Sequence, residues 1–232
     1  MNISSKDLKQ VVVFQHATDE DLNLILKNSI TRSMEEGGFF FLQGDEAIHL
    51  YILTSGQVKL MQSNPNGQQV NLRTIYPWQM FGALGAVRTD GAAYPASAQT
   101  LEDCTALAIP SLFLRSMLET RPYIAFDLMT LMTSYIQEMQ ARYRELATER
   151  VEQRVANALI RLAGQSGIKT EKEAGIELSL SRQDVAEMTG TTLYTVSRLL
   201  SDWERKGFIK TGRERIAIIN PHELVRIADG QV

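Results

Sequence analysis

Cysteine and histidine are scarce in this chain, and their scarcity excludes several kinds of site. The single cysteine, Cys104, rules out a disulfide within the chain and any zinc or iron–sulfur site built only from the cysteines of one chain. The three histidines, His16, His49 and His222, are far apart in the sequence, and no glycine-rich phosphate loop or nucleophile elbow accompanies them. We therefore predict that the chain is not an enzyme, and we assign no catalytic or metal-ligating residue.

Long apolar runs are also missing. No stretch of about twenty apolar residues occurs, and no signal peptide opens the chain. These absences argue against a membrane span or export, so we expect a cytoplasmic protein. With 232 residues, 44% of them hydrophobic and 22% charged, the chain suits two modest globular domains.

The net charge of −3 argues by itself against a protein that binds polyanions. The charge is unevenly distributed, however. Residues 1–110 carry 11 acidic and 7 basic side chains, whereas residues 181–232 carry 7 acidic and 8 basic ones. Any contact with nucleic acid is therefore expected at the C-terminal end, with strong salt dependence, through Arg182, Arg198, Arg205, Lys206, Lys210, Arg213 and Arg215.

Residues 179–208 predict two helices around a glycine turn. Ser181 and Asp184 have the spacing of a capping box, Gly190 breaks the first helix, and Gly207 supplies a left-handed residue that ends the second. Apolar residues at helical spacing predict the buried faces. They are Val185 and Met188 in the first helix, and Leu193, Val196, Leu199, Leu200 and Trp203 in the second.

The second helix carries a polar face opposite its apolar one. A rotation of about 100° per residue places Tyr194, Arg198, Ser201 and Arg205 on this face, with Ser197 at its edge. A guanidinium fork, hydroxyls and an aromatic ring suit phosphates and base edges in a major groove. In a single isolated helix, an ordinary solvated face would have the same pattern.

The residues that follow favour the DNA-binding interpretation. Strands at 207–210 and 215–219, joined by a hairpin with a basic tip at 211–214, complete a winged helix-turn-helix. A last short helix is expected after Asn220, with Pro221 in its first turn and Glu223 at the capping-box position. We predict DNA contacts from Arg182, Tyr194, Thr195, Ser197, Arg198 and Ser201.

The N-terminal part of the chain predicts short helices followed by a β-rich region. Thr18 and Asp21 cap a helix within residues 5–30. Short apolar strands then alternate with turn signals through 70–75 and 98–109, with Asn66-Gly67 as the strongest hairpin signal. This pattern predicts an antiparallel jelly roll or barrel, so the fold class is α+β with a β-rich N-terminal domain and a C-terminal winged helix-turn-helix.

A long helix is expected between these two parts. A helix opens at Pro110 and Ser111, is interrupted at Arg121-Pro122 and then continues to about Ala147. The long segment has two apolar lines and therefore needs two partners, which we take to be its own barrel and the same helix of a second chain. Burial inside a monomer is the alternative. The lines contain Ala125, Leu128, Met132, Tyr135, Met139 and Leu146, and Ile124, Leu131, Ile136 and Tyr143.

Three segments follow from this pattern. Residues 1–120 form the barrel, residues 121–150 form the dimerisation helix and its hinge at 148–150, and residues 151–232 form the DNA-binding domain. Within the last segment, residues 151–163 predict an amphipathic helix and residues 164–175 a polar surface loop.

Residues 179–219 resemble the DNA-binding domain of the cAMP receptor protein/FNR (Crp/Fnr) family of bacterial transcription regulators. The recognition helix of that family carries Glu-x-x-Ser-Arg or a close variant, and this chain has Tyr194-Thr-Val-Ser197-Arg198. Ser197 and Arg198 match, so the resemblance implies base or phosphate contacts for them. Tyr194 departs from the motif, and a tyrosine cannot accept a hydrogen bond from cytosine N4 as a carboxylate does.

The resemblance extends to the effector domain through Gly56, Asn66-Gly67 and Phe81-Gly-Ala-Leu84, which follow the family's order. It implies a homodimer on a pseudo-palindromic operator in double-stranded DNA, controlled by a small effector. It also implies that RNA polymerase is a partner, near residues 164–175.

The effector is not expected to be cyclic AMP. The cyclic-nucleotide members of the family use Gly-Glu-Leu for the ribose and Arg-Ser or Arg-Ala for the phosphate, whereas this chain has Gly82-Ala83-Leu84 and, near the second position, Tyr94-Pro95. Burying a phosphate without a cation costs several kcal/mol. Arg88 is the one nearby residue that could supply the missing charge.

Other effectors of the family leave an apolar or neutral ligand as the best hypothesis. The chain lacks the cysteine cluster of the oxygen-sensing branch, and Cys104 lies beside an apolar strand, where core packing is favoured over a redox role. Phe81, Tyr94, Tyr135 and Met139 could line an effector pocket or belong to plain core. Haem is the most concrete version of an apolar effector, although each histidine is more readily explained without it. DNA binding without any ligand remains open.

Two other function classes compete with a transcription regulator. A metal-binding or enzymatic jelly roll needs clustered histidine and carboxylate ligands on adjacent strands. A non-enzymatic adaptor would use the winged helix to bind protein, and would show no salt-dependent binding to DNA.

Overall fold

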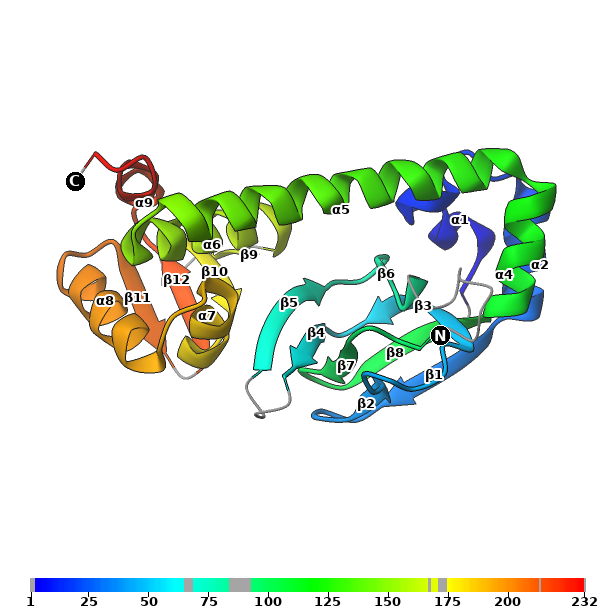
Figure 1. Ribbon diagram of the computed structural model, residues 1–232, viewed down its shortest axis with the longest axis horizontal. Helices are drawn as coiled ribbons and strands as arrows, with labels where there is room; N and C mark the ends of the chain where they lie inside the picture. Colours follow the sequence, from blue (N-terminus) through cyan, green and yellow to red (C-terminus); the bar gives the residue numbers. More distant parts are fainter. Residues whose placement is uncertain are drawn as a thin grey trace. The chain divides into compact units, whose positions relative to one another are not determined.

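The computed structural model describes residues 3–64, 69–83, 93–166, 168–170, 175–212 and 214–231, which pack as two compact units, 1–138 and 139–232. Figure 1 follows the chain from the N-terminus to the C-terminus. The first unit contains α1 (Ser5–Leu8), η1 (Val12–Phe14), α2 (Asp19–Asn28), β1 (Ile30–Met34), β2 (Phe39–Phe41), β3 (His49–Ser55), β4 (Val58–Ser63), β5 (Gln69–Ile75), β6 (Met80–Phe81), β7 (Ser97–Thr100), β8 (Cys104–Pro110) and α4 (Ser111–Thr120).

The helix α5 (Pro122–Thr148) begins in the first unit and ends in the second. The second unit further contains α6 (Val151–Ser166), β9 (Ile168–Thr170), β10 (Gly175–Ser179), α7 (Arg182–Thr189), α8 (Leu193–Arg205), β11 (Ile209–Gly212), β12 (Arg215–Ile218) and α9 (Pro221–Ala228). Within the described ranges, none of these helices combines the length and the apolar character that crossing a bilayer requires.

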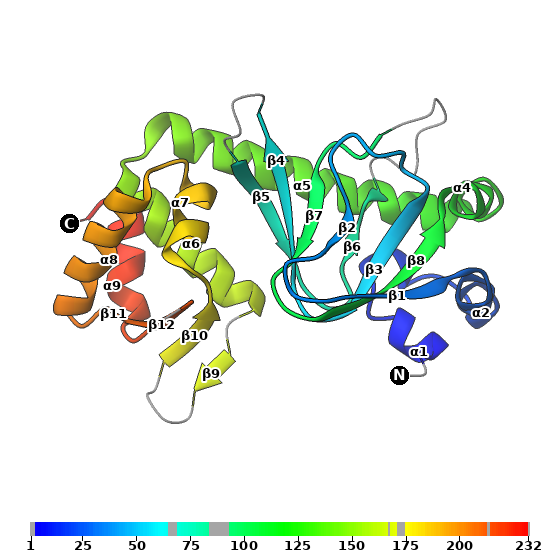
Figure 2. The ribbon, with the colours of Figure 1, turned by 90° about the horizontal axis from the view of Figure 1, so that it is seen from below.

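Two antiparallel four-stranded sheets form the β-rich domain of the first unit. Their strand orders are β1-β8-β3-β6 and β2-β7-β4-β5, and Figure 2 shows α1, α2 and α4 at one end of them. The predicted α+β class with a β-rich N-terminal domain is confirmed. The Asn66-Gly67 turn lies outside the described residues, but the strands on either side of it, β4 and β5, pair antiparallel as a hairpin requires.

The strand β3 is buried on both faces, which explains its unbroken apolar sequence. Leu50 and Ile52 pack into a core that includes residues of α1, α2, α4 and α5, whereas Tyr51 and Leu53 pack into a second core with residues of both sheets. Successive side chains of a strand point to opposite faces. Because each face has its own apolar partner, every position from 50 to 53 is buried.

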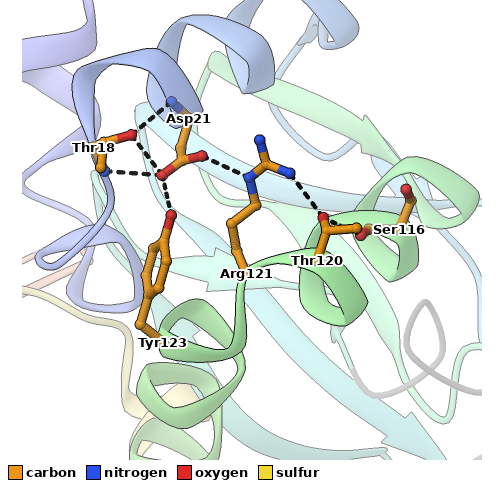
Figure 3. A network of polar contacts seen from close by, with 6 residues as sticks. All are labelled: Thr18, Asp21, Ser116, Thr120, Arg121 and Tyr123. Atoms are coloured by element: carbon orange, nitrogen blue, oxygen red, sulfur yellow. Dashed lines mark hydrogen bonds and ion pairs between the residues drawn. The ribbon is translucent and has the colours of Figure 1, made fainter.

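A buried carboxylate fixes the junction where α4 ends and α5 begins (Figure 3). Asp21 Oδ2 accepts hydrogen bonds from the Thr18 backbone N–H at 3.0 Å, from Thr18 Oγ1 at 2.7 Å and from the Tyr123 hydroxyl, and Asp21 Oδ1 accepts from Arg121 Nε at 2.7 Å. The predicted Thr18–Asp21 capping box is thus present. The same carboxylate also ties α2 to the first residues of α5.

The helix α5 carries both buried and exposed apolar side chains. Ile124 and Leu128 are buried, and Leu131 and Met132 pack partly against the same core. The exposed large apolar side chains of this helix are Tyr123, Phe126, Met129, Ile136, Met139, Tyr143 and Leu146. Each predicted line contains residues of both kinds: Leu128 is buried and Met139 exposed in the first, and Ile124 is buried and Ile136 exposed in the second. The helix runs to Thr148, as its periodicity predicted.

The second unit contains the predicted winged helix-turn-helix and two strands that the sequence did not predict. The helix α6 extends to Ser166, and β9 lies inside the segment predicted as a loop at 164–175, whereas β10 begins at the last residue of that segment. Both join a sheet of order β11-β12-β10-β9. The strand β10 was missed because it pairs with β12, about forty residues away, and such pairing leaves no local signal. The strand β9 pairs in turn with β10.

Candidate DNA-binding site and effector domain

The helices α7 and α8 form a capped helix-turn-helix. The Ser181 side chain accepts from the Asp184 N–H at 3.1 Å, and Asp184 accepts in return from the Ser181 N–H and hydroxyl, so the predicted capping box is confirmed. Gly190 ends α7 with φ +61°, a left-handed conformation that glycine adopts without strain. Thr192 then caps α8 by accepting from the Thr195 N–H at 3.2 Å, a cap that the sequence analysis missed.

The helix α8 is strongly two-sided. Val196, Leu199, Leu200 and Trp203 are buried, as predicted. Arg198, Ser201 and Arg205 are exposed, and 76% of the surface of Tyr194 is accessible. Leu193 was predicted in the buried face but is exposed, and it occupies the first position of the helix. Thr195 and Ser197 are half-buried at the margins of the polar face.

The predicted DNA-contact residues thus divide by environment. Tyr194, Arg198 and Ser201 share one open face of α8. Arg182 lies at the start of α7, half-buried, where its Nη2 donates to Thr211 Oγ1 in β11 at 3.1 Å. This contact with the wing was not predicted.

The wing itself is β11 and β12, an antiparallel pair in which Thr211 faces Ile216. The last helix, α9, starts after Asn220 with Pro221 in its first turn, as expected. The predicted Asn220–Glu223 capping box does not form, since the Asn220 side chain makes no capping bond and Glu223 pairs with Arg226 at 3.3 Å instead.

A cluster of polar side chains joins the end of α5 to α6 and α7. Arg154 donates to two backbone carbonyls, Thr189 O and Glu149 O, both at 3.0 Å. Asn157 donates to the Glu149 carboxylate at 2.9 Å, and Arg161 pairs with Glu145 at 3.0 Å. The hinge predicted at 148–150 therefore has its backbone held by α6. Sequence reasoning missed these residues because each bond joins separate elements.

Two of the four predicted effector residues share an aromatic cluster. Phe81 and Tyr94 lie in one aromatic cluster with Phe40, Phe41 and Tyr51. Tyr94 stacks on Phe41 with ring centroids 3.7 Å apart, and Phe41 stacks on Phe81 at 6.0 Å. Tyr135 instead lies under the Arg73 guanidinium, 4.0 Å from its ring centroid. Met139 is exposed on α5 and belongs to the second unit.

Tyr94 is fixed by hydrogen bonds as well as by stacking. Its hydroxyl donates to the His49 carbonyl oxygen at 2.6 Å and accepts from the His49 N–H at 3.1 Å. Burial raises the pKa of Tyr94 far above its ordinary value, so the ring stays neutral. Burial also lowers the pKa of His49.

The cysteine and the two other histidines have ordinary structural environments. Cys104 is buried as predicted, its Sγ donates to the Gln57 carbonyl oxygen at 3.2 Å, and burial raises the pKa of the thiol. His16 pairs with Asp127 at 2.9 Å, and His222 is exposed. In the part of the chain that the structure describes, no three histidine, cysteine or acidic side chains gather as metal ligands. Leu84 and Arg88, which bear on the cyclic AMP question, lie outside it.

Comparison with known proteins assigns each half of this architecture. Residues 31–121 match the cyclic nucleotide-binding domain family, and residues 153–227 match the Crp-like helix-turn-helix domain family. The transcriptional activator protein Anr of Pseudomonas aeruginosa is 27% identical over 213 residues, which cover 92% of this chain and 85% of that protein. A CRP-like cAMP-activated global transcriptional regulator of Mycobacterium tuberculosis is 25% identical over 221 residues, covering 95% of this chain and 98% of that protein.

The fold is also that of a solved regulator. The c-di-GMP responsive global regulator CLP of Xanthomonas campestris has a TM-score of 0.76 at 18% identity, covering 87% of this chain and 99% of that one. The two matched domains occur in this order along the chain, and the C-terminal one contains the capped helix-turn-helix and its wing. The chain belongs to the Crp/Fnr family of DNA-binding transcription regulators.

Proposed function

We propose that the chain is a homodimeric, sequence-specific regulator in which residues 1–120 receive a small effector, residues 121–150 pair two chains, and residues 151–232 bind double-stranded DNA. The observation that carries the DNA-binding part is the open polar face of α8, displayed by a helix whose opposite face is anchored in the core by Trp203 and three aliphatic side chains. A rigidly held helix can present the same side chains to each operator.

The contacts follow from side-chain chemistry. Arg198 offers the planar fork that pairs with O6 and N7 of guanine, and Ser197, Ser201 and Thr195 offer hydroxyls to phosphates or bases. Arg182 is placed for a phosphate. Tyr194 has a hydroxyl but no carboxylate, so the base pair that faces it is expected to differ from the one read by family members with glutamate at this position.

The dimer is supported by an unbroken heptad pattern on α5. Ala125, Met129, Met132, Ile136, Met139, Tyr143 and Leu146 follow alternating steps of four and three residues, the spacing with which two helices pack in a coiled coil. Five of them are exposed large apolar side chains in the single chain. A second copy of the same helix covers this stripe symmetrically and presents two copies of α8 to half-sites about one helical turn apart.

The effector is proposed to be apolar or neutral. The aromatic cluster around Tyr94 supports this, because such an interior favours an uncharged ligand over a phosphate. The relatives' names mention cyclic AMP for one and c-di-GMP for another, so family membership does not identify the ligand. An absorption spectrum recorded before and after adding haem tests the hypothesis that the effector is haem. If neither sample shows a Soret band, that hypothesis is eliminated.

The control mechanism is a population shift in which the effector changes the balance between arrangements of α5. Arg154, which bonds the ends of both α5 and α7, connects such a change to the DNA-binding helices. RNA polymerase is the further partner we expect, near residues 164–175.

Selection of bound duplexes from a random library, followed by mobility shifts on the selected operator, tests the proposal. Arg198→Ala is expected to weaken binding by about 1–3 kcal/mol and to relax the preference at one base pair. Arg226→Ala removes the same charge from α9, where Arg226 pairs with Glu223, and should bind as the wild type does. Unchanged operator affinity in the Arg198→Ala protein contradicts the assigned role.

A further inference from the structure

Three side chains from different elements join the start of α7, the end of α8 and the edge of the wing. Arg182 Nη2 donates to Thr211 Oγ1 at 3.1 Å. Thr211 in turn donates twice to Glu204, from its backbone N–H to Oε1 at 2.6 Å and from its hydroxyl to Oε2 at 2.9 Å. All three residues are half-buried.

The direction of the hydrogen bonds in this chain of contacts is fixed by chemistry. An ionised carboxylate only accepts hydrogen bonds, and a guanidinium only donates them. The single hydroxyl hydrogen of Thr211 therefore goes to Glu204, and a lone pair of the same oxygen receives Arg182. The Thr211 bonds lower the pKa of Glu204, with help from the charges of Arg182 and Lys210, which keeps the carboxylate ionised.

The contacts also attach the wing to α8. The strand β11 lies at the edge of its sheet, and the Thr211 N–H that Glu204 receives is one that β12 does not use. Glu204 thus holds the edge of the wing by accepting from the backbone N–H of Thr211. It also accepts from the Thr211 hydroxyl, whose oxygen accepts from Arg182, so Glu204 is linked to Arg182 through that hydroxyl. The Thr211 bond uses one of the five guanidinium donors of Arg182.

We propose that Glu204 and Thr211 are positioning residues for DNA binding: they hold the Arg182 guanidinium at the start of α7, where it meets a phosphate oxygen of the duplex, and couple that contact to α8 and the wing. This inference rests on the proposed DNA-binding function. Neither Glu204 nor Thr211 needs to touch DNA.

The test is the salt dependence of binding, which counts phosphate contacts. Fluorescence anisotropy of the full-length protein with a random-sequence duplex, between about 50 and 200 mM salt, gives the slope of log Kobs against log salt, to which each phosphate contact contributes about 0.9. Arg182→Ala is expected to reduce the slope by about 0.9. Thr211→Val is expected to reduce it equally, and to have no further effect on the slope in the Arg182→Ala protein.

Two variants separate positioning from general damage. Thr211→Ser keeps the hydroxyl and should retain the wild-type slope. Glu223→Gln removes one negative charge from the same unit and should also leave the slope unchanged, since Glu223 pairs with Arg226 of its own helix, α9. Trp203 is buried in this unit, so its fluorescence reports whether each variant is folded. If Thr211→Val does not fold, Glu204→Gln replaces it, with the same expected loss of slope.

The results that would overturn this inference differ from the result that would contradict the proposed function. A wild-type slope in Thr211→Val, in its replacement Glu204→Gln, or in Arg182→Ala overturns the inference, and so does an equal further loss of slope on adding Thr211→Val to Arg182→Ala. A wild-type protein that binds no DNA at any salt concentration contradicts the proposed function itself.

Discussion

Arg121 Nε lies 2.7 Å from Asp21 Oδ1, and this ion pair closes a polar cluster between the start of α2 and the start of α5. Only 4% of the Asp21 side chain is accessible, so the carboxylate depends on its protein partners in place of water. The cluster bonds α2 to the start of the long helix within the unit of residues 1–138.

Asp21→Asn is expected to lower the free energy of unfolding of the first unit by roughly 2–3 kcal/mol. The amide keeps only one acceptor oxygen for Arg121 and Tyr123, which bond different oxygens of Asp21, and it removes the negative charge that pairs with Arg121. Urea titration followed by Trp78 fluorescence measures this loss. Asp19→Asn is the matched control, since Asp19 is an exposed partner of Lys9 and surface pairs contribute little. Equal unfolding midpoints for the two variants would contradict the role given to Asp21.

The same carboxylate predicts a loss of stability in acid. Its hydrogen bonds to Tyr123, Arg121 and Thr18 outweigh the effect of burial and hold the pKa of Asp21 well below its ordinary value. In the unfolded chain Asp21 takes up its proton near the ordinary pKa of about 3.9. The stabilisation is therefore complete above this pH and declines as the pH falls below it. Unfolding measured between neutral pH and pH ~3 should show the wild type losing more stability than Asp21→Asn; parallel curves would refute this.

Arg154→Met is expected to destabilise the unit of residues 139–232 by about 2 kcal/mol, since two backbone carbonyls lose a charged donor. Chemical denaturation followed by Trp203 fluorescence measures the change. Arg150→Met removes the same charge from an exposed neighbouring position and should unfold like the wild type. Indistinguishable midpoints for both variants would show that the Arg154 bonds do not stabilise the hinge.

Ile136→Glu is expected to dissociate the proposed dimer. If each of two symmetric isoleucines loses about 1.5 kcal/mol of burial energy, the dissociation constant rises at least about 100-fold. Sedimentation equilibrium measures it directly. Gln137→Glu adds the same charge one residue away, outside the heptad stripe, and should remain dimeric. If the dissociation constant of Ile136→Glu equals that of the wild type, the dimer interface does not include the heptad stripe of α5.

Substituting Gly56 and Gly44 by alanine distinguishes the backbone cost of a positive φ from the steric cost of an added methyl group. Both have positive φ, +84° and +95°, but a Cβ at Gly56 would lie 2.5 Å from Cys104 Sγ, whereas a Cβ at Gly44 meets nothing within 4 Å. Gly44→Ala should cost about 1 kcal/mol of stability from the backbone alone. Gly56→Ala should cost about 1–3 kcal/mol more from overpacking. Urea titration of both variants checks the difference, and equal losses would refute the steric argument.

Local signals in the sequence predicted the elements that depend on local bonds. The capping boxes of Thr18–Asp21 and Ser181–Asp184, and the left-handed Gly190, each involve residues within a few positions of one another. The two faces of α8 followed from its periodicity alone. Leu193 was the exception, since its exposure depends on where the surrounding core ends.

Contacts between distant residues were not predictable in the same way. The bonds of Arg154 to Thr189 and of Arg182 to Thr211 join positions 35 and 29 residues apart. The pairing of β10 with β12 and the contact of Arg73 with the Tyr135 ring likewise depend on the tertiary arrangement. The heptad pattern with exposed residues on α5 was not recognised in the sequence, because the helix carries two overlapping apolar patterns. Only the packing of the fold shows which apolar side chains the core buries.

The shielded thiol of Cys104 has a practical consequence for measuring motion in this regulator. Because its sulfur is buried and its ionisation is suppressed, maleimide dyes or nitroxide labels should attach selectively to a cysteine introduced on the surface. A labelled pair, with one site in each unit, can then report distances between the units with and without DNA while the native residue stays in place.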